Sequence, residues 1–304
     1  MADFSLHFMD NILTLQNELK NKTYRHGGYQ AFKINDPKPR DIHKASVRDR
    51  LVHHAIHRIL YPYFDQKFIF DSYSCRDEKG THKAIDRFRR FAYIVSKNHT
   101  RTCWILKGDI RKFFANIDHE ILKDILAKHV GDKNVLWLLS QVIDSFKTMG
   151  KNAVGLPLGN LTSQLLVNIY MNEFDQFAKR ELKIHFYIRY ADDFVIFSES
   201  KRYLESIIPR ISEFLKTELG LSLHPDKLFI KTLNAGMDFL GWVNFPYHRV
   251  LRTSTKRRML RNLKQKPKSE TVASYLGLLS HGNTHQLSNE VKLSTGQGVD
   301  KGVV

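Results

Sequence analysis

Two adjacent aspartates interrupt a stretch that otherwise has the pattern of buried β-strand. Asp192 and Asp193 lie within "YIRYADDFVIFS", residues 187–198. Neighbouring carboxylates repel each other and strand interiors disfavour Asp, so the pair carries a local energetic cost. Because Asp is a good turn residue, one explanation is a turn that simply tolerates the pair. The other explanation is a divalent cation bound by both carboxylates.

A third aspartate strengthens the explanation by a cation. Asp109 follows the apolar stretch in "WILKGD" and so can end a strand of the same sheet. Three converging aspartates would supply the hard oxygen ligands that suit Mg²⁺, which also binds substrate phosphates. Two such ions about 4 Å apart can activate a 3′ hydroxyl and stabilise a leaving pyrophosphate. The indicated chemistry is in-line phosphoryl transfer.

The surrounding pattern predicts the elements that would position these carboxylates. "KIHFYIRYADDFVIFS" predicts two strands joined by a tight turn, and "TCWILKGDI" predicts a short strand followed by a helix. "LTSQLLVNIYMNEFDQFAKREL" predicts a long helix with one buried face, and "LSLHPDKLFI" and "MDFLGWVNF" predict further short strands. The first hundred residues combine helical patterns with Pro-rich and basic connectors, which predicts a lobe dominated by helices.

Length and cysteine content exclude several classes of protein. A chain of 304 residues can form one large domain or two to three lobes with a substantial core. Cys75 and Cys103 are too few for a disulfide framework or a structural zinc site, so a reducing cytoplasm is the simplest compartment. No apolar run approaches the roughly 18 residues that span a bilayer, and the N-terminus lacks the pattern of a signal peptide.

The chain is strongly basic, with 48 Lys and Arg against 31 Asp and Glu and a formal net charge of +17. Such a surface attracts polyanions, most commonly nucleic acid and secondly an anionic membrane surface. Residues 249–268, "RVLRTSTKRRMLRNLKQKPK", carry nine basic residues and no acidic one. This segment predicts a helix laid along a phosphate backbone, and the alternative is an ordinary solvated basic face.

Taken in order, the motifs resemble those of reverse transcriptases. "YADD" is preceded by "LKGDIRKFFANIDH" and "GLPLGNLTSQLLVNIYMNEFD" and is followed by "LSLHPDK" and "DFLGW". The resemblance extends upstream through "DPKPRDIHKASVRDRLVHHAI" and "DSYSCRDEKGTHKAI", so it covers roughly residues 15–285. A "YADD" alone would be weak support, whereas the ordered series is specific.

Within that superfamily the chain most resembles the reverse transcriptases of bacterial and phage diversity-generating retroelements. The stretches that carry this resemblance are "SYSCRDEKGTHKA" and "LPLGNLTSQ", in which Gln164 stands where most relatives have Pro. Such enzymes copy a template RNA into cDNA with frequent errors opposite adenine. The resemblance therefore implies an error-prone RNA-directed DNA polymerase.

The same resemblance implies an α+β fold of the right-hand polymerase type, with an antiparallel sheet in the palm. The expected partition is fingers at 1–100, palm at 101–125, a fingers–palm connection at 126–154, palm at 155–244, thumb at 245–290 and a disordered tail at 291–304.

The resemblance also assigns roles to individual residues. Asp109 and Asp192 match the principal metal ligands and Asp193 a supporting one, with Ile110 offering its backbone carbonyl. The implied cofactor is a pair of Mg²⁺ ions, for which Mn²⁺ is a possible substitute.

A second set of residues is expected to bind the incoming nucleotide. Phe114 matches the aromatic residue that lies under the sugar and excludes a 2′ hydroxyl, and the alternative is that Phe114 is core while Phe113 faces the sugar. The other members of this set are Arg76, Lys79 and Lys83 for the triphosphate, Gln164 beside the templating base, and Lys227 for the departing pyrophosphate. The alternative for Gln164 is a side chain that hydrogen-bonds locally at the start of its helix.

A third set is expected to contact template and primer. Gly159 would let backbone approach the substrate, Ser163 can cap a helix, and Gly241 and Trp242 match the hairpin that holds the primer terminus. The remaining residues expected at the template or primer are Arg40, Lys44, Arg48, Lys256, Arg257 and Arg258, with Arg50 in the same basic stretch as the first three.

The expected partners are an RNA template, a DNA or RNA primer and deoxynucleotides, in a bacterial or phage-encoded cytoplasmic enzyme that needs no membrane. Relatives of the retroelement type also bind a small basic accessory protein. Two alternatives stay open: a defence-associated or retron-like bacterial reverse transcriptase, and a polymerase-derived RNA-binding subunit that has lost catalysis. The complete set of aspartates argues against the second alternative.

Overall fold

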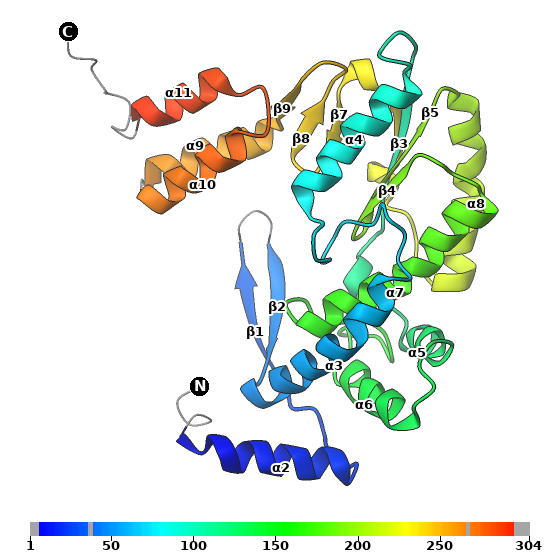
Figure 1. Ribbon diagram of the computed structural model, residues 1–304, viewed down its shortest axis with the longest axis vertical. Coiled ribbons are helices and arrows are strands. Elements are labelled where there is room, and N and C mark those ends of the chain that lie inside the picture. Colours follow the sequence, from blue (N-terminus) through cyan, green and yellow to red (C-terminus); the bar gives the residue numbers. More distant parts are fainter. Residues whose placement is uncertain (1–5, 36–38, 266–267, 295–304) are drawn as a thin grey trace. The chain divides into compact units, whose positions relative to one another are not determined.

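The computed structural model describes residues 6–35, 39–265 and 268–294 and combines helices with β-sheets (Figure 1). Contacts within the chain divide it into two compact units. The first unit comprises residues 1–80, 107–195 and 206–228, and the second comprises residues 81–106, 196–205 and 229–304. The predicted boundaries of fingers, palm and thumb follow a different criterion and stay predictions.

The helices and strands have the following bounds. The α-helices are α2 (Phe8–Lys20), α3 (Val47–Asp65), α4 (Thr81–Val95), α5 (His119–Ala127), α6 (Lys133–Asp144), α7 (Leu161–Gln176), α8 (Lys201–Leu219), α9 (Thr253–Gln265), α10 (Ser269–Leu279) and α11 (His285–Ser294). The strands are β1 (Tyr29–Ile34), β2 (Arg40–Ala45), β3 (Trp104–Asp109), β4 (Tyr187–Tyr190), β5 (Asp193–Ser198), β6 (Phe229–Thr232), β7 (Met237–Phe239), β8 (Trp242–Asn244) and β9 (Arg249–Leu251). Short 3₁₀ turns are Phe113–Asn116, Pro225–Lys227 and Leu233–Ala235, and a π-helical turn is Phe177–Glu181.

The strands form three sheets, and the predicted strands around the aspartates are confirmed. The central sheet has the order β4-β5-β3-β6, and two smaller sheets are β1-β2 and β7-β8-β9. Strands β4 and β5 are joined by a tight turn at Ala191 and Asp192, as predicted, and Ala191 adopts a left-handed φ of 54°. Both strands are almost wholly buried, which explains their apolar pattern.

Helix α7 is more deeply buried than its sequence pattern predicts. The sequence predicts one buried face, but polar side chains such as Thr162, Asn168 and Asp175 are buried as well as the apolar ones. Helix α3 packs beside α7 in the first unit (Figure 1). The polar residues are tolerated because they hydrogen-bond, as Asn168 does when its Nδ2 donates to the carbonyl of Ser74 at 2.8 Å.

A buried ion pair joins α7 to strand β4. Arg189 donates from Nε to Asp175 Oδ1 at 2.8 Å and from Nη2 to Oδ2 at 2.7 Å, and both residues are completely buried. The Tyr187 hydroxyl donates to the same carboxylate at 2.7 Å. Arg189 Nη1 donates to the carbonyl of Ala191 at 3.1 Å, so the pair also fixes the β4–β5 turn.

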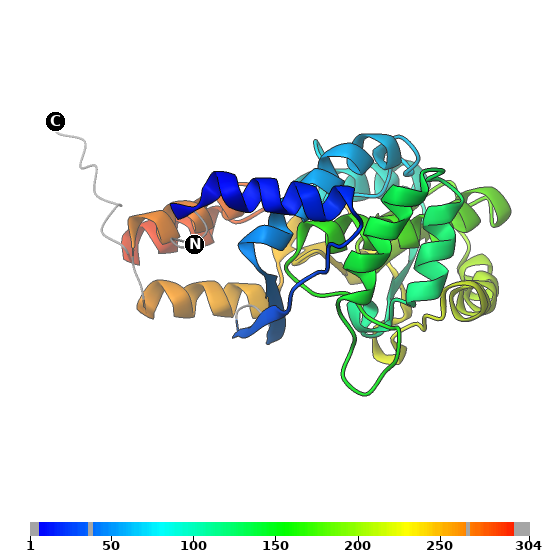
Figure 2. The same cartoon turned by 90° about the horizontal axis from the view of Figure 1, so that it is seen from below.

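The first unit also contains a hairpin that the sequence pattern did not predict. Strands β1 and β2 pair antiparallel from Tyr29 opposite Ala45 to Ile34 opposite Arg40. Most of their residues are exposed, so the sequence lacks the apolar alternation that marks a half-buried strand. Helices α2, α3 and α4 still account for far more of the first hundred residues than the two strands do, so the prediction of a helix-dominated region holds and the hairpin is an addition to it. After α6, the chain loops away from the neighbouring helices (Figure 2), and Met149 in that loop is fully exposed.

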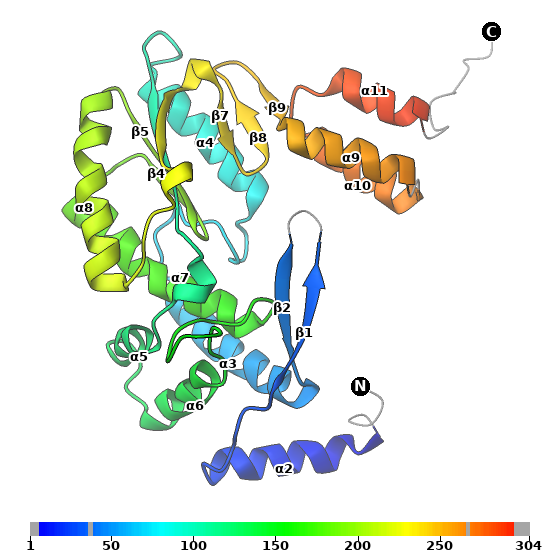
Figure 3. The same ribbon diagram turned by 180° about the vertical axis from the view of Figure 1, so that it is seen from behind.

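In the second unit, helix α4 has one apolar face that packs on aromatic side chains. Its Phe88 ring contacts the rings of Phe197 and Phe239, with centroids 4.8 Å and 5.4 Å away. Strands β7 and β8 are joined by a two-residue turn at Leu240 and Gly241, which both have positive φ, as this kind of hairpin requires. Figure 3 shows α4 beside this hairpin.

The basic segment 249–268 was predicted to be one helix, and this is wrong at its start. Residues Arg249–Leu251 form strand β9, which pairs with β8, and helix α9 begins at Thr253. Helices α10 and α11 follow and pack together (Figure 3). Helix α11 continues to Ser294, so residues 291–294 are helical although a disordered tail was predicted from 291, and residues 295–304 lie outside the described part. None of the described helices has both the length and the apolar character needed to cross a bilayer.

We expect the Arg189→Met variant to lose about 3–5 kcal/mol of unfolding free energy, because Asp175 would be left buried without its cation. Urea unfolding followed by circular dichroism measures this loss. The exposed Arg202 of α8 provides the matched control, and Arg202→Met should change stability by less than about 0.5 kcal/mol. An Asp175→Leu, Arg189→Met double variant should recover part of the loss, and equal stability of Arg189→Met and wild type would contradict the role of the pair.

Candidate active site

Asp109 is the last residue of β3 and is buried, with 6% of its surface exposed. Its backbone is held from the neighbouring segment, because the N–H of His224 donates to its carbonyl at 2.8 Å. Gly108, the preceding residue, has no room for a side chain, since a Cβ there would overlap the ring of Phe194. Strands β3 and β5 therefore approach closely only because residue 108 is glycine.

The β4–β5 turn brings the other two aspartates to the same place. The N–H of Ile110 donates to the carbonyl of Asp192 at 3.1 Å, which ties the turn to the end of β3. Asp193 is the first residue of β5, next in the sheet to β3. The predicted convergence of Asp109, Asp192 and Asp193 is present in the structure.

The three carboxylates interact electrostatically. Burial, followed by the charges of Asp193 and Asp109, raises the pKa of Asp192 from 3.8 to about 6. Burial and the nearby Asp109 also raise the pKa of Asp193, although the cation of Lys107 opposes this shift. Carboxylates in this arrangement favour either a bound proton or a bound cation.

Two lysines stand against these carboxylates. Lys227 Nζ donates to Asp109 Oδ2 at 2.8 Å, so the structure places this predicted pyrophosphate-binding residue at the site. Lys107 Nζ lies 4.0 Å from Asp193 Oδ1, and its side chain is nearly buried. The sequence interpretation missed Lys107. A lysine inside the apolar strand "WILKGD" is unusual, and this could have indicated a special role.

The donor set has the right chemistry for a hard divalent cation. It consists of one buried and two half-buried carboxylates with an unfavourable mutual repulsion that a cation would relieve. In the described part of the chain, however, no three His, Cys, Asp or Glu side chains are arranged closely enough to hold a metal ion as they stand. One oxygen of Asp109 is already in contact with Lys227 Nζ, at 2.8 Å. The two predicted Mg²⁺ ions stay a prediction.

The two neighbouring phenylalanines after Asp109 differ in burial. Phe113 is core, with 3% of its surface exposed, whereas Phe114 is half-buried. Their rings meet edge to face with centroids 5.6 Å apart. This arrangement favours Phe114 over Phe113 as the residue that faces a nucleotide sugar.

Arg76 has a structural position that was not predicted. Its Nε donates to Asp65 Oδ1 at 2.6 Å, and its Nη1 donates to the carbonyls of Ile69 and Ser72. Only 6% of its side chain is exposed. The contacts do not support the prediction that Arg76 grips a triphosphate, because its guanidinium already clamps the loop after α3.

The two lysines predicted beside Arg76 are also placed by the structure. Lys79 Nζ donates to the carbonyl of Phe70 at 2.9 Å and lies 3.5 Å from the centroid of the Phe70 ring. Lys83 belongs to α4 in the second unit. These observations do not test nucleotide binding, so the predicted triphosphate contacts of Lys79 and Lys83 stay predictions.

The upstream basic residues fall into two groups. Arg48 is engaged with Glu18 and Asp49 and lies over the Tyr24 ring, so its contacts favour a structural role over the predicted template contact. Arg40 and Lys44 are exposed on β2, as a phosphate contact requires.

Lys44 also lines a hollow of about 320 Å³ together with Arg50. Arg50 Nε is buried and has no hydrogen-bond partner among the described residues. A buried guanidinium nitrogen without a partner is costly, so this hollow is a further candidate for anion binding in the first unit.

The motif that begins α7 holds the β1–β2 hairpin. A Cβ at Gly159, where φ is 99°, would lie 2.7 Å from the Ile42 side chain of β2. Asn160 Nδ2 donates to the carbonyl of His43 at 2.7 Å, and His43 donates from its N–H to Leu158. The close approach that Gly159 permits is therefore to β2, whereas an approach to the substrate was predicted.

Ser163 and Gln164, further along this motif, differ in burial. Ser163 is buried within the first turn of α7, whose N-cap is Asn160, so the predicted capping role of Ser163 is wrong. Gln164 is half-buried, and its side-chain amide makes no hydrogen bond with any residue that the structure describes. The alternative of a locally bonded Gln164 is therefore not supported.

Trp242 occupies the core of the second unit, in contrast to its predicted position against the primer. Only 1% of its surface is exposed, and it packs with Met259, Val272 and Leu279 from the helices that follow. Gly241 forms the hairpin turn and accepts from the N–H of Arg252 at 3.0 Å. The turn itself remains available for the predicted primer contact, but the indole does not.

Helix α9 has the amphipathic character expected of a helix on nucleic acid. Met259 and Leu263 are buried on one side, whereas Lys256 and Arg257 are exposed and Arg258 is half-buried. This exposure is compatible with a row of phosphate contacts along the helix.

A family model described as "Reverse transcriptase (RNA-dependent DNA polymerase)" matches residues 33–244, which is more than half of the chain. The chain belongs to the reverse transcriptase family, and its enzymatic class is RNA-directed DNA polymerase.

Curated relatives come from bacteria and from introns. The chain is 27% identical over 276 residues to protein YkfC of Escherichia coli K12, covering 77% of this chain and 70% of YkfC. It is 29% identical over 192 residues to the group II intron-encoded protein LtrA of Lactococcus lactis, covering 60% of this chain and 30% of LtrA. A putative COX1/OXI3 intron 2 protein of Saccharomyces cerevisiae is 22% identical, with 74% of this chain and 32% of the yeast protein covered. The chain thus spans about a third of the last two relatives.

Solved structures of telomerase share the fold. Apo telomerase from Candida tropicalis superposes with a TM-score of 0.55 at 14% identity, covering 90% of this chain and 57% of telomerase. Telomerase from the same organism in complex with a telomeric RNA fragment gives a TM-score of 0.56 at 13% identity, covering 96% and 56%. At such low identity the likeness concerns the fold alone, and it confirms the predicted α+β right-hand polymerase fold.

We expect Asp192→Asn to stabilise the protein by about 1–3 kcal/mol at pH 7.5 in EDTA, because it removes a charge that the fold disfavours. The pKa of Asp192 is about 6 in the folded protein against 3.8 for the free group. Its contribution to the free energy of unfolding is therefore fully present below pH 3.8 and is lost as the pH rises through 6. The difference between variant and wild type should therefore grow from pH 4 to pH 7.5. Urea unfolding at both pH values measures it.

A suitable control for this comparison is Asp226→Asn, since 88% of the Asp226 side chain is exposed. That variant should unfold like wild type at both pH values. If Asp192→Asn is no more stable than wild type at pH 7.5, the proposed repulsion among the three carboxylates is wrong.

Proposed function

We propose that the protein adds deoxynucleotides to the 3′ end of a primer on an RNA template, with Asp109, Asp192 and Asp193 as its catalytic carboxylates. The observation that carries this proposal is the electrostatic coupling of three carboxylates, the buried Asp109 at the end of β3 and the half-buried Asp192 and Asp193 at the β4–β5 turn. Lys227 on Asp109 adds a cation at the same point. Surface aspartates in a tolerant turn would be solvated and would not be coupled in this way.

The residues fit a division of labour in nucleotidyl transfer. Asp109, Asp192 and the carbonyl of Ile110 would hold Mg²⁺, which when bound favours the ionised 3′ hydroxyl and offsets charge on the phosphates. The backbone bond from the Ile110 N–H to the Asp192 carbonyl holds the chain segments that carry Asp109 and Asp192 together before substrate arrives. Lys227, whose Nζ contacts Asp109 Oδ2, would supply an ammonium for the charge of the departing pyrophosphate.

Two further features support a deoxynucleotide substrate on a nucleic-acid duplex. The half-buried Phe114 presents a rigid ring beside the catalytic strand, and such a ring would clash with a 2′ hydroxyl. The exposed cations of α9 suit the phosphates of a template–primer duplex, so duplex binding should weaken as salt increases.

Sequencing of the cDNA made from a defined RNA template and primer tests the catalytic proposal. We expect product from wild type and a fall of roughly three orders of magnitude or more in the Asp192→Asn, Asp193→Asn double variant. Glu213→Gln, which changes an exposed carboxylate of α8, serves as the control and should retain activity. Product from the double variant would refute the role of the carboxylates, and a lack of product from wild type as well would favour an RNA-binding subunit.

We further propose that synthesis is error-prone opposite adenine, as in diversity-generating retroelements, and that Gln164 contributes to this property. The support is the "LPLGNLTSQ" motif together with the amide of Gln164, which finds no bond within the described chain. An unbonded amide can donate to or accept from a base edge and so can tolerate more than one pairing. A retron-like or defence-associated enzyme is the alternative, and it predicts no adenine bias.

The error spectrum of a Gln164→Met variant tests this role. Methionine keeps the length of the side chain but removes the amide, whereas Gln164→Pro would also break the bond from the Gln164 N–H to Asn160 at 3.3 Å. We expect errors opposite adenine to fall toward the rate opposite the other bases, while the yield of cDNA is kept. An unchanged adenine error rate at normal yield would rule out this function of Gln164.

A further inference from the structure

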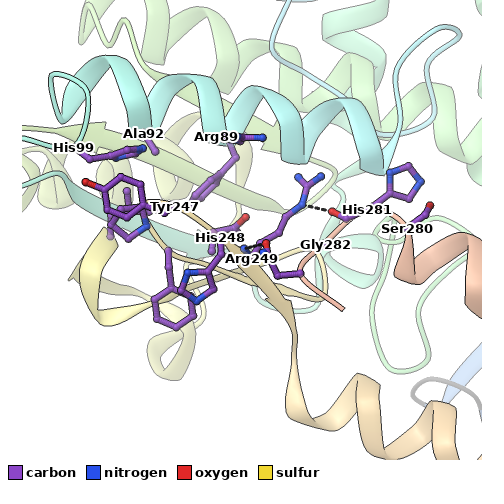
Figure 4. Close-up of a pocket in the computed structure, with 15 residues that line it drawn as sticks. Arg89, Ala92, His99, Tyr247, His248, Arg249, Ser280, His281 and Gly282 are labelled. Atoms are coloured by element: carbon purple, nitrogen blue, oxygen red, sulfur yellow. Dashed lines mark hydrogen bonds between the residues drawn. The ribbon is translucent and has the colours of Figure 1, made fainter. Parts of the chain in front are cut away.

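The second unit contains a hollow that shares no residue with the aspartate site. It has a volume of about 330 Å³ and is formed by α4, the β8–β9 turn and the loop after α10 (Figure 4). This volume lies within the range of small-ligand sites. An adjoining hollow of about 560 Å³ shares Arg89, His99 and Tyr247 with it, so the two form a continuous surface depression.

Positive charge dominates this depression. Arg89, Arg90 and Arg249 line it, and the single carboxylate among its lining residues is Asp86. Asp86 is already paired, since Arg249 Nη1 lies 3.2 Å from its Oδ1. Arg89 is exposed and makes no hydrogen bond or ion pair with any residue that the structure describes. Its guanidinium is therefore available for a phosphate, which it can bind through two parallel hydrogen bonds.

Aromatic rings lie beside these cations. Tyr247 is 78% exposed at the tip of the β8–β9 turn, and its ring meets the His99 ring edge to face at 5.0 Å. The His248 ring stacks on Phe245 with centroids 4.7 Å apart, and this contact joins the two sides of the turn. Figure 4 shows Tyr247 and His99 together at one end of the hollow. An exposed, braced aromatic ring is the kind of surface on which an unpaired base stacks.

Hydrogen bonds fix the backbone of the turn that carries Tyr247. The N–H of Phe245 donates to the carbonyl of His248 at 2.9 Å. Arg249 donates from Nε to the carbonyl of His281, and the N–H of Asn283 donates to the carbonyl of Arg249 at 2.9 Å. These bonds join the β8–β9 turn to the loop after α10 within the second unit.

We propose that this depression binds nucleotide units, with a base stacked on Tyr247 and a phosphate held by Arg89. Two adjoining hollows that share Tyr247 suit consecutive nucleotides of a single strand, so the favoured source is single-stranded RNA, and a free mononucleotide presents the same chemistry. The site is separate from catalysis and does not depend on the proposed function of the aspartates.

Photocrosslinking of the full-length chain to a single-stranded RNA that contains 4-thiouridine tests the proposal. After tryptic digestion and mass spectrometry, we expect a crosslink within residues 245–249. Tyr247→Ala and Arg89→Ala should each reduce its yield by at least about fivefold, whereas Tyr247→Phe, which keeps the ring, should retain it. Both changed side chains are exposed, so the variants should melt like wild type.

The matched control is Arg202→Ala, which removes another exposed arginine of the second unit, at the start of α8 and outside the depression. An equal loss in this variant would overturn the site and indicate non-specific attraction, and so would crosslinks confined to other peptides. Competition by excess UMP would assign the site to mononucleotides, whereas competition by unlabelled RNA alone would assign it to a strand. The crosslink should persist in the Asp192→Asn, Asp193→Asn double variant, so a failure of the catalytic proposal is distinguishable from a failure of this one.

Discussion

The buried pair of Asp175 and Arg189 is the interaction on which the β4–β5 turn depends. Burial opposes the charge of Arg189, but Asp175 outweighs it and raises the pKa of the guanidinium. Burial and the same carboxylate raise the pKa of Tyr187. Desolvating two charges is costly, and the cost is offset only where every donor is satisfied. Arg189 meets this condition through Asp175, Asn168, Ser72 and the carbonyl of Ala191.

Because Arg189 reaches the carbonyl of Ala191, the position of the turn follows from the core and not from the loop alone. The turn must hold Asp192 and Asp193 beside Asp109 against their mutual repulsion. A flexible loop would relax by moving the carboxylates apart. The buried pair, together with the Ile110 to Asp192 backbone bond, prevents that relaxation. The site is therefore destabilised locally and supported by its surroundings, which is a common relation between stability and activity.

The sequence predicts those parts of the structure whose signal is local. Alternating apolar residues with an interrupting Asp pair predict β4, β5 and their turn, and a strand ending in Asp109 predicts β3. The β1–β2 hairpin escapes prediction because its stability comes from backbone pairing and from the Gly159 loop against Ile42, which leave no apolar pattern. The burial of polar side chains cannot be predicted for a related reason. No local pattern distinguishes an arginine that faces solvent from one that faces a carboxylate of another element.

The cations that were predicted to bind nucleic acid or nucleotide differ in whether they have partners inside the protein. Arg48 and Arg76 fall in motifs that resemble nucleic-acid-binding segments, yet each is used by carboxylates or carbonyls of its own unit. Lys256 and Arg257 on α9 are exposed instead. The net charge of +17 is therefore a poor guide to where a polyanion binds. Cations with internal partners add to the net charge but offer little to a polyanion, whereas the exposed cations of α9 are concentrated on one helix. A cation without an internal partner is the one that can contact a phosphate. Such a cation stays hydrated until a phosphate arrives, so its contribution to binding should depend on the salt concentration. The internal ion pairs of Arg48 and Arg76 should not show this dependence.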